Sequence, residues 1–276
     1  NAGDPFALAA PASVVVFQPS SLFYVYDMVH MSNFSGRTVG NLTFDDRVGT
    51  SNIGGALPLY IYNTCRFKSK DACAQTYNGT GPGVIGGDLI VESGSAGLVD
   101  GSVLAAPTNF EVQGNINALG TFTPSTDIHR IYLLDGTNLQ NVTLNAGASK
   151  VPNLTVNNPS GINLGSTLTV SSTLTMTNGN IVTNANTFTL GTSVNFIGKL
   201  NRTAGTIVVG PGTFTRWVAT STPSYDFPIG TSSTFNEATV NFTVAPTTGG
   251  TIASLFTVTN PGTNGLPLTD VTLNLT

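Results

Sequence analysis

The chain has 276 residues, of which only 9% are charged, and its formal net charge is −4. Ten Lys and Arg residues are spread thinly along this acidic chain, so the composition argues against nucleic acid as a partner. Hydrophobic residues make up 40% of the chain, which argues against disorder, and no apolar run approaches the roughly 20 residues of a membrane-spanning helix.

Short strands are predicted along the first half of the chain. They are SLFYVYD (21–27), GNLTFDD (40–46), LPLYIYN (57–63), GGDLIVE (86–92) and NFEVQGN (109–115). Apolar and polar residues alternate within them, the period-2 pattern of a strand with one buried face and one face in water.

Residues 63–83 interrupt these strands and are predicted to form an insertion on one rim. Cys65 and Cys73 lie in this segment and enclose the short polar stretch RFKSKDA, which predicts a disulfide, with two free thiols as the alternative. A metal site would need more ligands than two cysteines without a nearby histidine supply. An oxidised pair would indicate an extracytoplasmic compartment.

A regular repeat runs through the middle of the chain. NLTV (153–156) recurs as TLTM (173–176), and TLTV (167–170) recurs as TFTL (187–190) with the same spacing. Three apolar columns share this spacing: Leu134, Leu154, Leu174 and Val194; Val156, Met176 and Phe196; and Phe122, Val142, Ile162 and Val182. We therefore expect a chain that coils once per repeat of about 20 residues and stacks equivalent strands in parallel.

Asparagines mark the predicted turns of this repeat. Asn138, Asn158 and Asn178 follow one another at the repeat spacing, and their side-chain amides are expected to hydrogen-bond along the stack. The alternative is that asparagine merely suits the backbone of turns.

The predicted fold is all-β. Residues 1–210 are expected to form a right-handed parallel β-helix, or solenoid, with about 20 residues per coil. After Gly210 the strands become longer, as in TFNEATVNFTVAP, so residues 211–276 are predicted to form a short β-sandwich-like segment. The last residues, LTDVTLNLT, are strand-like, and we expect a segment of a longer polypeptide.

Two clusters combine acidic and cationic side chains. They are Asp45, Asp46 and Arg47, and Asp127, His129 and Arg130. Glycoside hydrolysis needs two carboxylates that face each other across a groove. We interpret the first cluster as an exposed turn, the second as a solvated rim, and His30 as a packed strand residue. No catalytic, cofactor or metal site is predicted.

Trp217 and Tyr225 are the candidate glycan contacts. With Phe214 and Phe227 close in sequence, they could form an aromatic platform for a sugar ring. The competing interpretation is that Trp217, the single tryptophan, fills the junction between solenoid and sandwich.

The repeats resemble those of large surface proteins of the Bacteroidetes. The resemblance is carried by NLTVNNPSGINLGSTLTVSSTLTMTNGNIVTNANTFTLG (153–191) and GRTVGNLTFDD (36–46), and it covers roughly residues 36–265. The element Phe227, Pro228, Ile229 and Gly230 is similar to a Phe-Pro-Val-Gly-like element that opens a β-sandwich after such repeats. The resemblance implies export by the type IX secretion machinery and supplies no catalytic residues.

These patterns predict a non-catalytic structural or adhesive segment, extracellular or on the outer cell surface. Its expected partners are surface glycans or other cell-surface proteins. The alternative is a carbohydrate-binding or polysaccharide-degrading β-helix module, which would be recognised by a cleft with paired carboxylates or an exposed tryptophan.

Overall fold

The computed structural model describes residues 17–26, 34–45, 52–68, 73–145, 149–221, 224–255 and, as backbone alone, 271–274. Every regular element in these residues is a β-strand, as the sequence predicts. The described residues contain no helix of the length and hydrophobicity that a membrane crossing requires.

Two long sheets run along the molecule. The first sheet has the order β1 (Leu22–Tyr26), β3 (Asn41–Asp45), β5 (Cys65–Phe67), β8 (Leu89–Val91), β11 (Ile116–Ala118), β14 (Gln140–Leu144), β16 (Ile162–Leu164), β18 (Ile181–Val182), β21 (Ile207–Val208), β23 (Ser224–Gly230) and β24 (Phe235–Asn241). The second sheet has the order β2 (Thr38–Val39), β4 (Leu59–Ile61), β7 (Gly83–Ile85), β10 (Thr108–Val112), β13 (Arg130–Leu134), β15 (Lys150–Asn157), β17 (Leu168–Asn178), β19 (Thr187–Leu190), β22 (Thr213–Val218), β25 (Gly250–Ser254) and β26 (Val271–Asn274).

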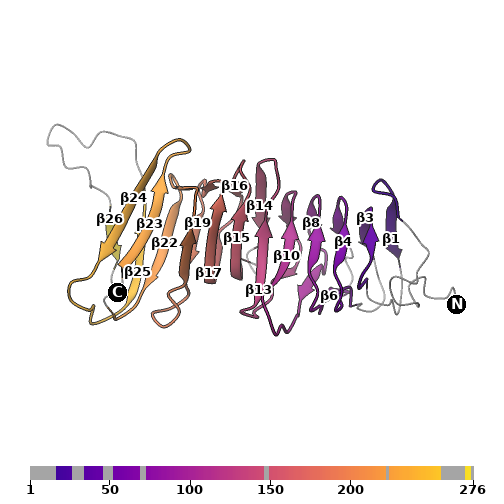
Figure 1. The fold of residues 1–276 in the computed structure, drawn as a ribbon, viewed down its shortest axis with the longest axis horizontal. Helices are drawn as coiled ribbons and strands as arrows, with labels where there is room; N and C mark the ends of the chain where they lie inside the picture. The colour runs from indigo at the N-terminus through magenta and orange to yellow at the C-terminus, as the bar shows by residue number, and fades with distance from the viewer. Residues whose placement is uncertain are drawn as a thin grey trace.

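Among the described residues, four further strands lie outside these two sheet orders. A third, short sheet has the order β12 (Phe122–Thr123), β9 (Leu98–Asp100) and β6 (Gln75–Tyr77), and β20 (Lys199–Arg202) pairs with β17. Neighbouring strands of a sheet come from successive coils and pair in parallel as far as β23. The chain is therefore a β-solenoid, drawn out from the indigo strand β1 to the orange strands β22 to β24 (Figure 1).

One hydrophobic core runs the length of the solenoid, from Val25 to Ile252. It forms because strand alternation sends every second side chain inward, as in β5 and β8, where the outer two of three residues are buried and the middle one is not. Aromatic rings also stack between coils, with 5.1 Å between the ring centroids of Phe44 and Phe67. Each coil thus buries its apolar residues against its neighbours.

The repeat spacing is confirmed where the repeat is most regular. Leu154 pairs with Leu174, and Val156 pairs with Met176. A glycine with positive φ allows two coils to approach closely at one turn. A Cβ on Gly205 (φ +87°) would lie 2.0 Å from the carbonyl oxygen of Gly179 in the preceding coil. Close coil stacking therefore requires glycine at this turn.

The number of residues per coil varies elsewhere, so the other neighbours predicted within the three apolar columns are wrong. Leu134 pairs with Val156, where Leu154 was expected. Leu174 pairs on its other side with Leu200, where Val194 was expected. Sequence spacing counts the loop residues of each coil, whereas register depends on the paired strands alone.

Two further predicted neighbours are also corrected. Met176 pairs with Arg202 instead of Phe196. The column of Phe122, Val142, Ile162 and Val182 is not formed, because Ile162 pairs with Gln140 and Ile181, and Phe122 belongs to the third sheet.

Side-chain amides bridge the coils, but only partly at the predicted residues. Asn158 Nδ2 donates to the backbone oxygen of Asn138 at 2.6 Å. An amide ladder lies instead along the first sheet, where Asn141 donates to Asn115 at 3.3 Å and Asn163 donates to Asn141 at 3.4 Å.

The described residues of the segment 63–83, which are 63–68 and 73–83, belong to the solenoid wall, which corrects the predicted insertion. It supplies β5 and β6, which pair in the first and third sheets. Cys65 faces the core between Leu42 and Leu89, and burial raises the pKa of its thiol. Cys65 and Cys73 are both buried and free, so the predicted disulfide is not formed in the structure.

Parallel stacking continues beyond residue 210. β22 pairs in parallel with β19, and β23 pairs in parallel with β21. β24 is then antiparallel to β23, β25 to β22, and β26 to β25. These last strands extend the two solenoid sheets, so a separate sandwich is not confirmed.

Candidate functional site

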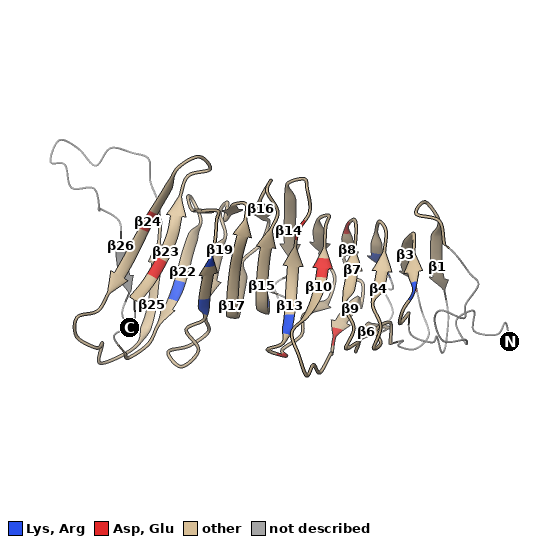
Figure 2. Cartoon of the chain, viewed as in Figure 1, with Lys and Arg blue, Asp and Glu red and all other residues tan. Residues whose placement is uncertain are grey.

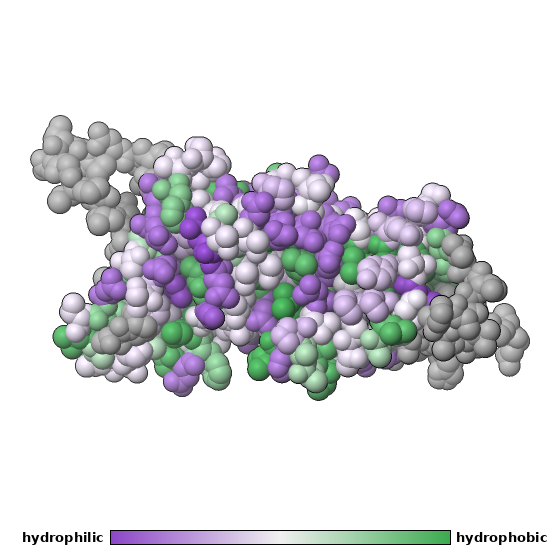
Figure 3. Space-filling view, in the orientation of Figure 1, coloured by the Kyte–Doolittle hydropathy of each residue, from purple (hydrophilic) through white to green (hydrophobic). Residues whose placement is uncertain are grey.

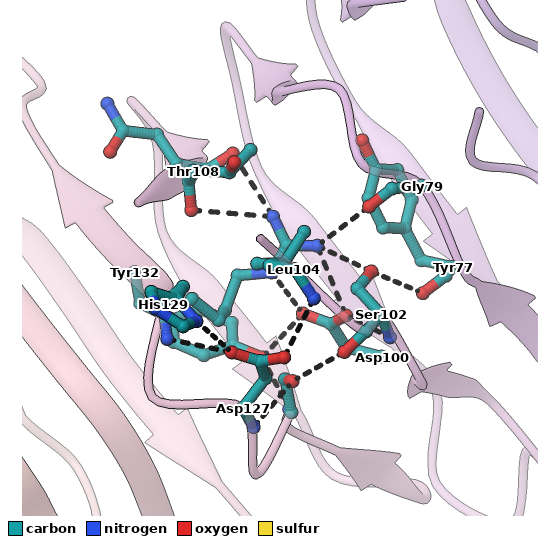
Figure 4. A network of polar contacts seen from close by, with 12 residues as sticks. Tyr77, Gly79, Asp100, Ser102, Leu104, Thr108, Asp127, His129 and Tyr132 are labelled. Carbon is teal, nitrogen blue, oxygen red and sulfur yellow. Dashed lines mark hydrogen bonds and ion pairs between the residues drawn. The ribbon is translucent and has the colours of Figure 1, made fainter. Parts of the chain in front are cut away.

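Arg130 belongs to a buried polar network with Asp100, Ser102 and Tyr132, which are labelled in Figure 4. It opens β13 and points inward, where its Nε lies 3.0 Å from Asp100 Oδ2 and both side chains are 0% exposed. Its Nη2 donates to Ser102 Oγ at 2.5 Å, and the Tyr132 hydroxyl donates to Asp100 at 2.8 Å. Burial, followed by the Asp100 charge, raises the pKa of Tyr132 well above its usual value.

The prediction that Arg130 lies on a solvated rim is wrong, because its side chain is buried in this network. The guanidinium carbon lies 5.4 Å from the ring centroid of Tyr77 in β6, so the side chain joins neighbouring coils rather than contacting solvent. Buried charges are stable only when they are paired and hydrogen-bonded, and Asp100 provides both for Arg130. Such an arrangement stabilises the coils and leaves no substrate access.

Asp127 and His129 lie at the edge of the same network. The Asp127 carboxylate accepts hydrogen bonds from the backbone N–H groups of Leu104 at 2.7 Å and His129 at 2.8 Å. The Leu104 hydrogen bond is the largest cause of the lowered pKa of Asp127. His129 Nδ1 lies 3.0 Å from Asp127 Oδ1, so the carboxylate closes a turn.

The first predicted cluster is described only at Asp45. Its carboxylate lies 3.2 Å from Lys68 Nζ and accepts a hydrogen bond from the Tyr24 hydroxyl. Asp46, Arg47 and His30 lie outside the described residues.

Trp217 and Tyr225 do not form a common platform. Alternation in β22 buries Phe214, Arg216 and Val218 and leaves Trp217 half-buried on the outward face. Tyr225 points inward, is 1% exposed, and accepts a hydrogen bond from Ala219 N at 2.8 Å. Trp217 keeps an exposed surface, whereas Tyr225 contributes to the lining of a groove that Trp217 does not line.

Sequence reasoning missed a groove of about 980 Å³, here called the junction groove. It lies where the second sheet divides, because β17 pairs with β19 through Leu168–Val170 and with β20 through Thr173–Met176. Its lining includes Ser171, Ser172 and Thr173, together with Phe196, which is 68% exposed. No motif could have indicated it, since its lining residues come from several coils.

The junction groove is rich in cations. Lys150, Lys199 and Arg216 line it, together with one carboxylate, Asp226. Figure 2 shows the sparse charges of the molecule, with blue positions in β22 and near β19 and red in β23. Across the visible face, polar and apolar side chains are intermixed (Figure 3).

Arg216 is the buried cation of this groove. It is only 6% exposed, donates from Nη1 to the backbone oxygen of Asp226 at 2.7 Å, and has no hydrogen-bond partner at Nε. The ion pairs of the described residues do not include it. Burial is the largest cause of its lowered pKa, and the Asp226 charge opposes that shift.

A second groove, of about 410 Å³, is lined by Asp88, Asn115, Asp135 and Gln140. Asp135 Oδ1 is buried without a hydrogen-bond partner. Burial, followed by the charge of Glu111, raises the pKa of Asp135 to about 6. Asp135 therefore has the raised pKa that a general acid needs, and Glu111 is a second carboxylate near it that does not line this groove.

Among the described residues, no three His, Cys, Asp or Glu side chains gather as metal ligands. No protein-family model matches the chain, and no curated protein or solved structure matches it either. The features of the chain that bear on function are therefore the geometry of the solenoid and its grooves.

Proposed function

We propose that the chain is a non-catalytic structural and adhesive segment of a larger bacterial surface protein. The observation that carries this proposal is the single core that continues from Val25 to Ile252 through stacked coils. Stacked coils produce an extended body whose length grows with the number of repeats and whose sides offer a long contact surface. Such a segment can hold other modules away from the cell and contact surface glycans or proteins.

Location and export belong to the same proposal. A charged fraction of only 9%, together with the resemblance of the repeats to Bacteroidetes surface proteins, supports an extracellular or outer-surface position and export by the type IX machinery. We also propose a right-handed solenoid, because crossover connections between parallel strands are almost always right-handed. The antiparallel strands β24 to β26 would begin a sandwich-like segment.

The alternative, a carbohydrate-binding or polysaccharide-degrading module, is supported by the two grooves. The junction groove supports binding, since it combines hydroxyl groups, an exposed aromatic ring and cations. The Asp135 and Glu111 pair supports degradation, since a carboxyl with a raised pKa next to a second carboxylate suits general acid catalysis.

The test is incubation of the whole chain with plant, algal and host polysaccharides. We expect no new reducing ends and no unsaturated products. Asp135→Asn is the matched variant, because it removes the carboxyl best suited to act as an acid while keeping its shape. Turnover by the unmodified chain that Asp135→Asn abolishes would overturn the non-catalytic proposal.

A further inference from the structure

We propose that the junction groove binds an anionic glycan that carries carboxylate or sulfate groups, and that Arg216 contacts its charge. This inference rests on the adhesive function proposed above and names the ligand class. It depends on a buried cation, on the polar lining of the groove and on the direction in which the groove runs.

The buried cation is the first step of the argument. Arg216 lines the groove while it is only 6% exposed, and its Nε has no hydrogen-bond partner. A buried charge is costly unless it is paired and hydrogen-bonded. Arg130 Nε also lacks a hydrogen-bond partner, but it lies 3.0 Å from the Asp100 carboxylate, whereas the ion pairs of the described residues do not include Arg216. An incoming anion would supply the missing partner.

Packing alone does not explain an arginine at this position. Arg216 pairs with Leu190, which pairs with Val170 in the preceding coil, and both of these residues are buried and apolar. The tyrosine ring of Tyr225, 5.5 Å from the guanidinium carbon, holds the side chain in place through a cation–π contact. The planar guanidinium fork suits carboxylate and sulfate groups, because it can donate two parallel hydrogen bonds.

The surrounding charges favour an anion. Lys150 and Lys199 also line the groove, and both are exposed. Asp226 is the opposing charge, but its Oδ1 already accepts a hydrogen bond from the Thr239 hydroxyl at 2.9 Å. Three cations therefore face one carboxylate in a chain whose net charge is −4.

The rest of the lining favours a sugar chain. Ser171, Ser172 and Thr173 offer hydroxyl groups for hydrogen bonds, and the exposed ring of Phe196 offers an apolar face against which a sugar can stack. The lining runs from Ile128, before β13, to Asp226 in β23, so it crosses several successive coils. A groove along the stack fits an extended polymer.

The experiment measures binding of the whole chain to four probes of equal length by calorimetry at low salt. The probes are an oligogalacturonate, a sulfated dextran oligosaccharide, neutral dextran and poly-glutamate. We expect binding to the oligogalacturonate, the sulfated oligosaccharide or both, and none to neutral dextran. The first two probes distinguish carboxylate from sulfate as the recognised group.

Arg216→Met is the decisive variant. It should weaken binding by about tenfold or more, because a charged hydrogen bond is lost, while its melting temperature should equal or exceed that of the unmodified chain. Arg66→Met is the matched control, since it removes the same charge from a half-buried ion pair with Glu92 and should leave binding unchanged. A purely structural arginine would instead give a less stable variant with unchanged binding.

Lys199→Gln is the second variant and keeps the proposal testable if Arg216→Met fails to fold. Because Lys199 is an exposed cation of the groove, this variant should weaken binding several-fold. Failure of both anionic glycans to bind, unchanged binding by these variants, or equal binding of poly-glutamate would overturn the inference. These outcomes would leave the structural proposal intact. That proposal would be contradicted by polysaccharide turnover or by a compact shape of the chain in solution.

Discussion

At the scale of single residues, this chain treats its buried charges in two ways. Arg130 and Asp100 neutralise each other at 3.0 Å inside the solenoid. Arg216 and Asp135 each line a groove, and the ion pairs of the described residues include neither of them. The paired charges join coils, whereas Arg216 and Asp135 can respond to a ligand or to pH.

Asp135→Asn should stabilise the protein in a pH-dependent way. The pKa of Asp135 is raised to about 6, so the folded state favours the protonated form. Its contribution to stability is full below the usual carboxyl pKa and is lost as the pH rises through about 6. The melting temperature of Asp135→Asn should therefore exceed that of the unmodified chain near pH 8 and approach it near pH 4.

Asp127→Asn provides the opposite control. Backbone hydrogen bonds lower the pKa of Asp127, so its ionised form stabilises the fold above the usual carboxyl pKa, and that contribution is lost as the pH falls. This variant should melt at a lower temperature near pH 8. Equal melting of Asp135→Asn and the unmodified chain at both pH values would mean that Asp135 is well solvated.

At the scale of strands, coil stacking determines which substitutions are tolerated. β17 alternates between buried Leu174 and outward Thr175, and the coils on each side place Leu154 and Leu200 against Leu174. A change inside this column affects three coils, whereas a change outside it meets only Thr155 and Asn201.

Leu174→Asp should destabilise the protein by about 3 kcal/mol or more, because it buries a carboxylate without a partner. Thr175→Asp should cost about 0.5 kcal/mol or less, because the new charge remains in contact with water. Denaturant unfolding of the two variants measures the difference. Similar midpoints would show that the inward and outward faces of β17 are misassigned.

At the scale of the whole molecule, the solenoid is an elongated body with one continuous core (Figure 1). Stacked strands lie about 4.8 Å apart, so ten coils would extend on the order of 50 Å. Small-angle scattering of the isolated chain should give the distance distribution of a rod, with a maximum dimension above about 50 Å. The distribution of a sphere would contradict both the stack and the proposed spacer function.

The local structure of this protein follows from its amino-acid pattern. Strands are predicted wherever apolar residues alternate with Thr, Asn or Ser. The prediction is reliable because successive side chains of a β-strand always point to opposite faces of the sheet. The regular repeat placed Leu154 beside Leu174, because the coil between them has no extra loop. The all-β class and the parallel stack were thus predictable.

Tertiary structure decided the register and the sites. Leu200 took the place expected for Val194, because the loop between β19 and β20 lengthens that coil. The tertiary structure also brings Lys150, Lys199 and Arg216 together in one groove, although cations are sparse along the sequence. Stacking brings together residues that are one coil apart. The number of residues in a coil depends on its loops, and no local sequence pattern specifies their length. The neighbours of Leu174 and the lining of the groove could therefore not be predicted from sequence spacing alone.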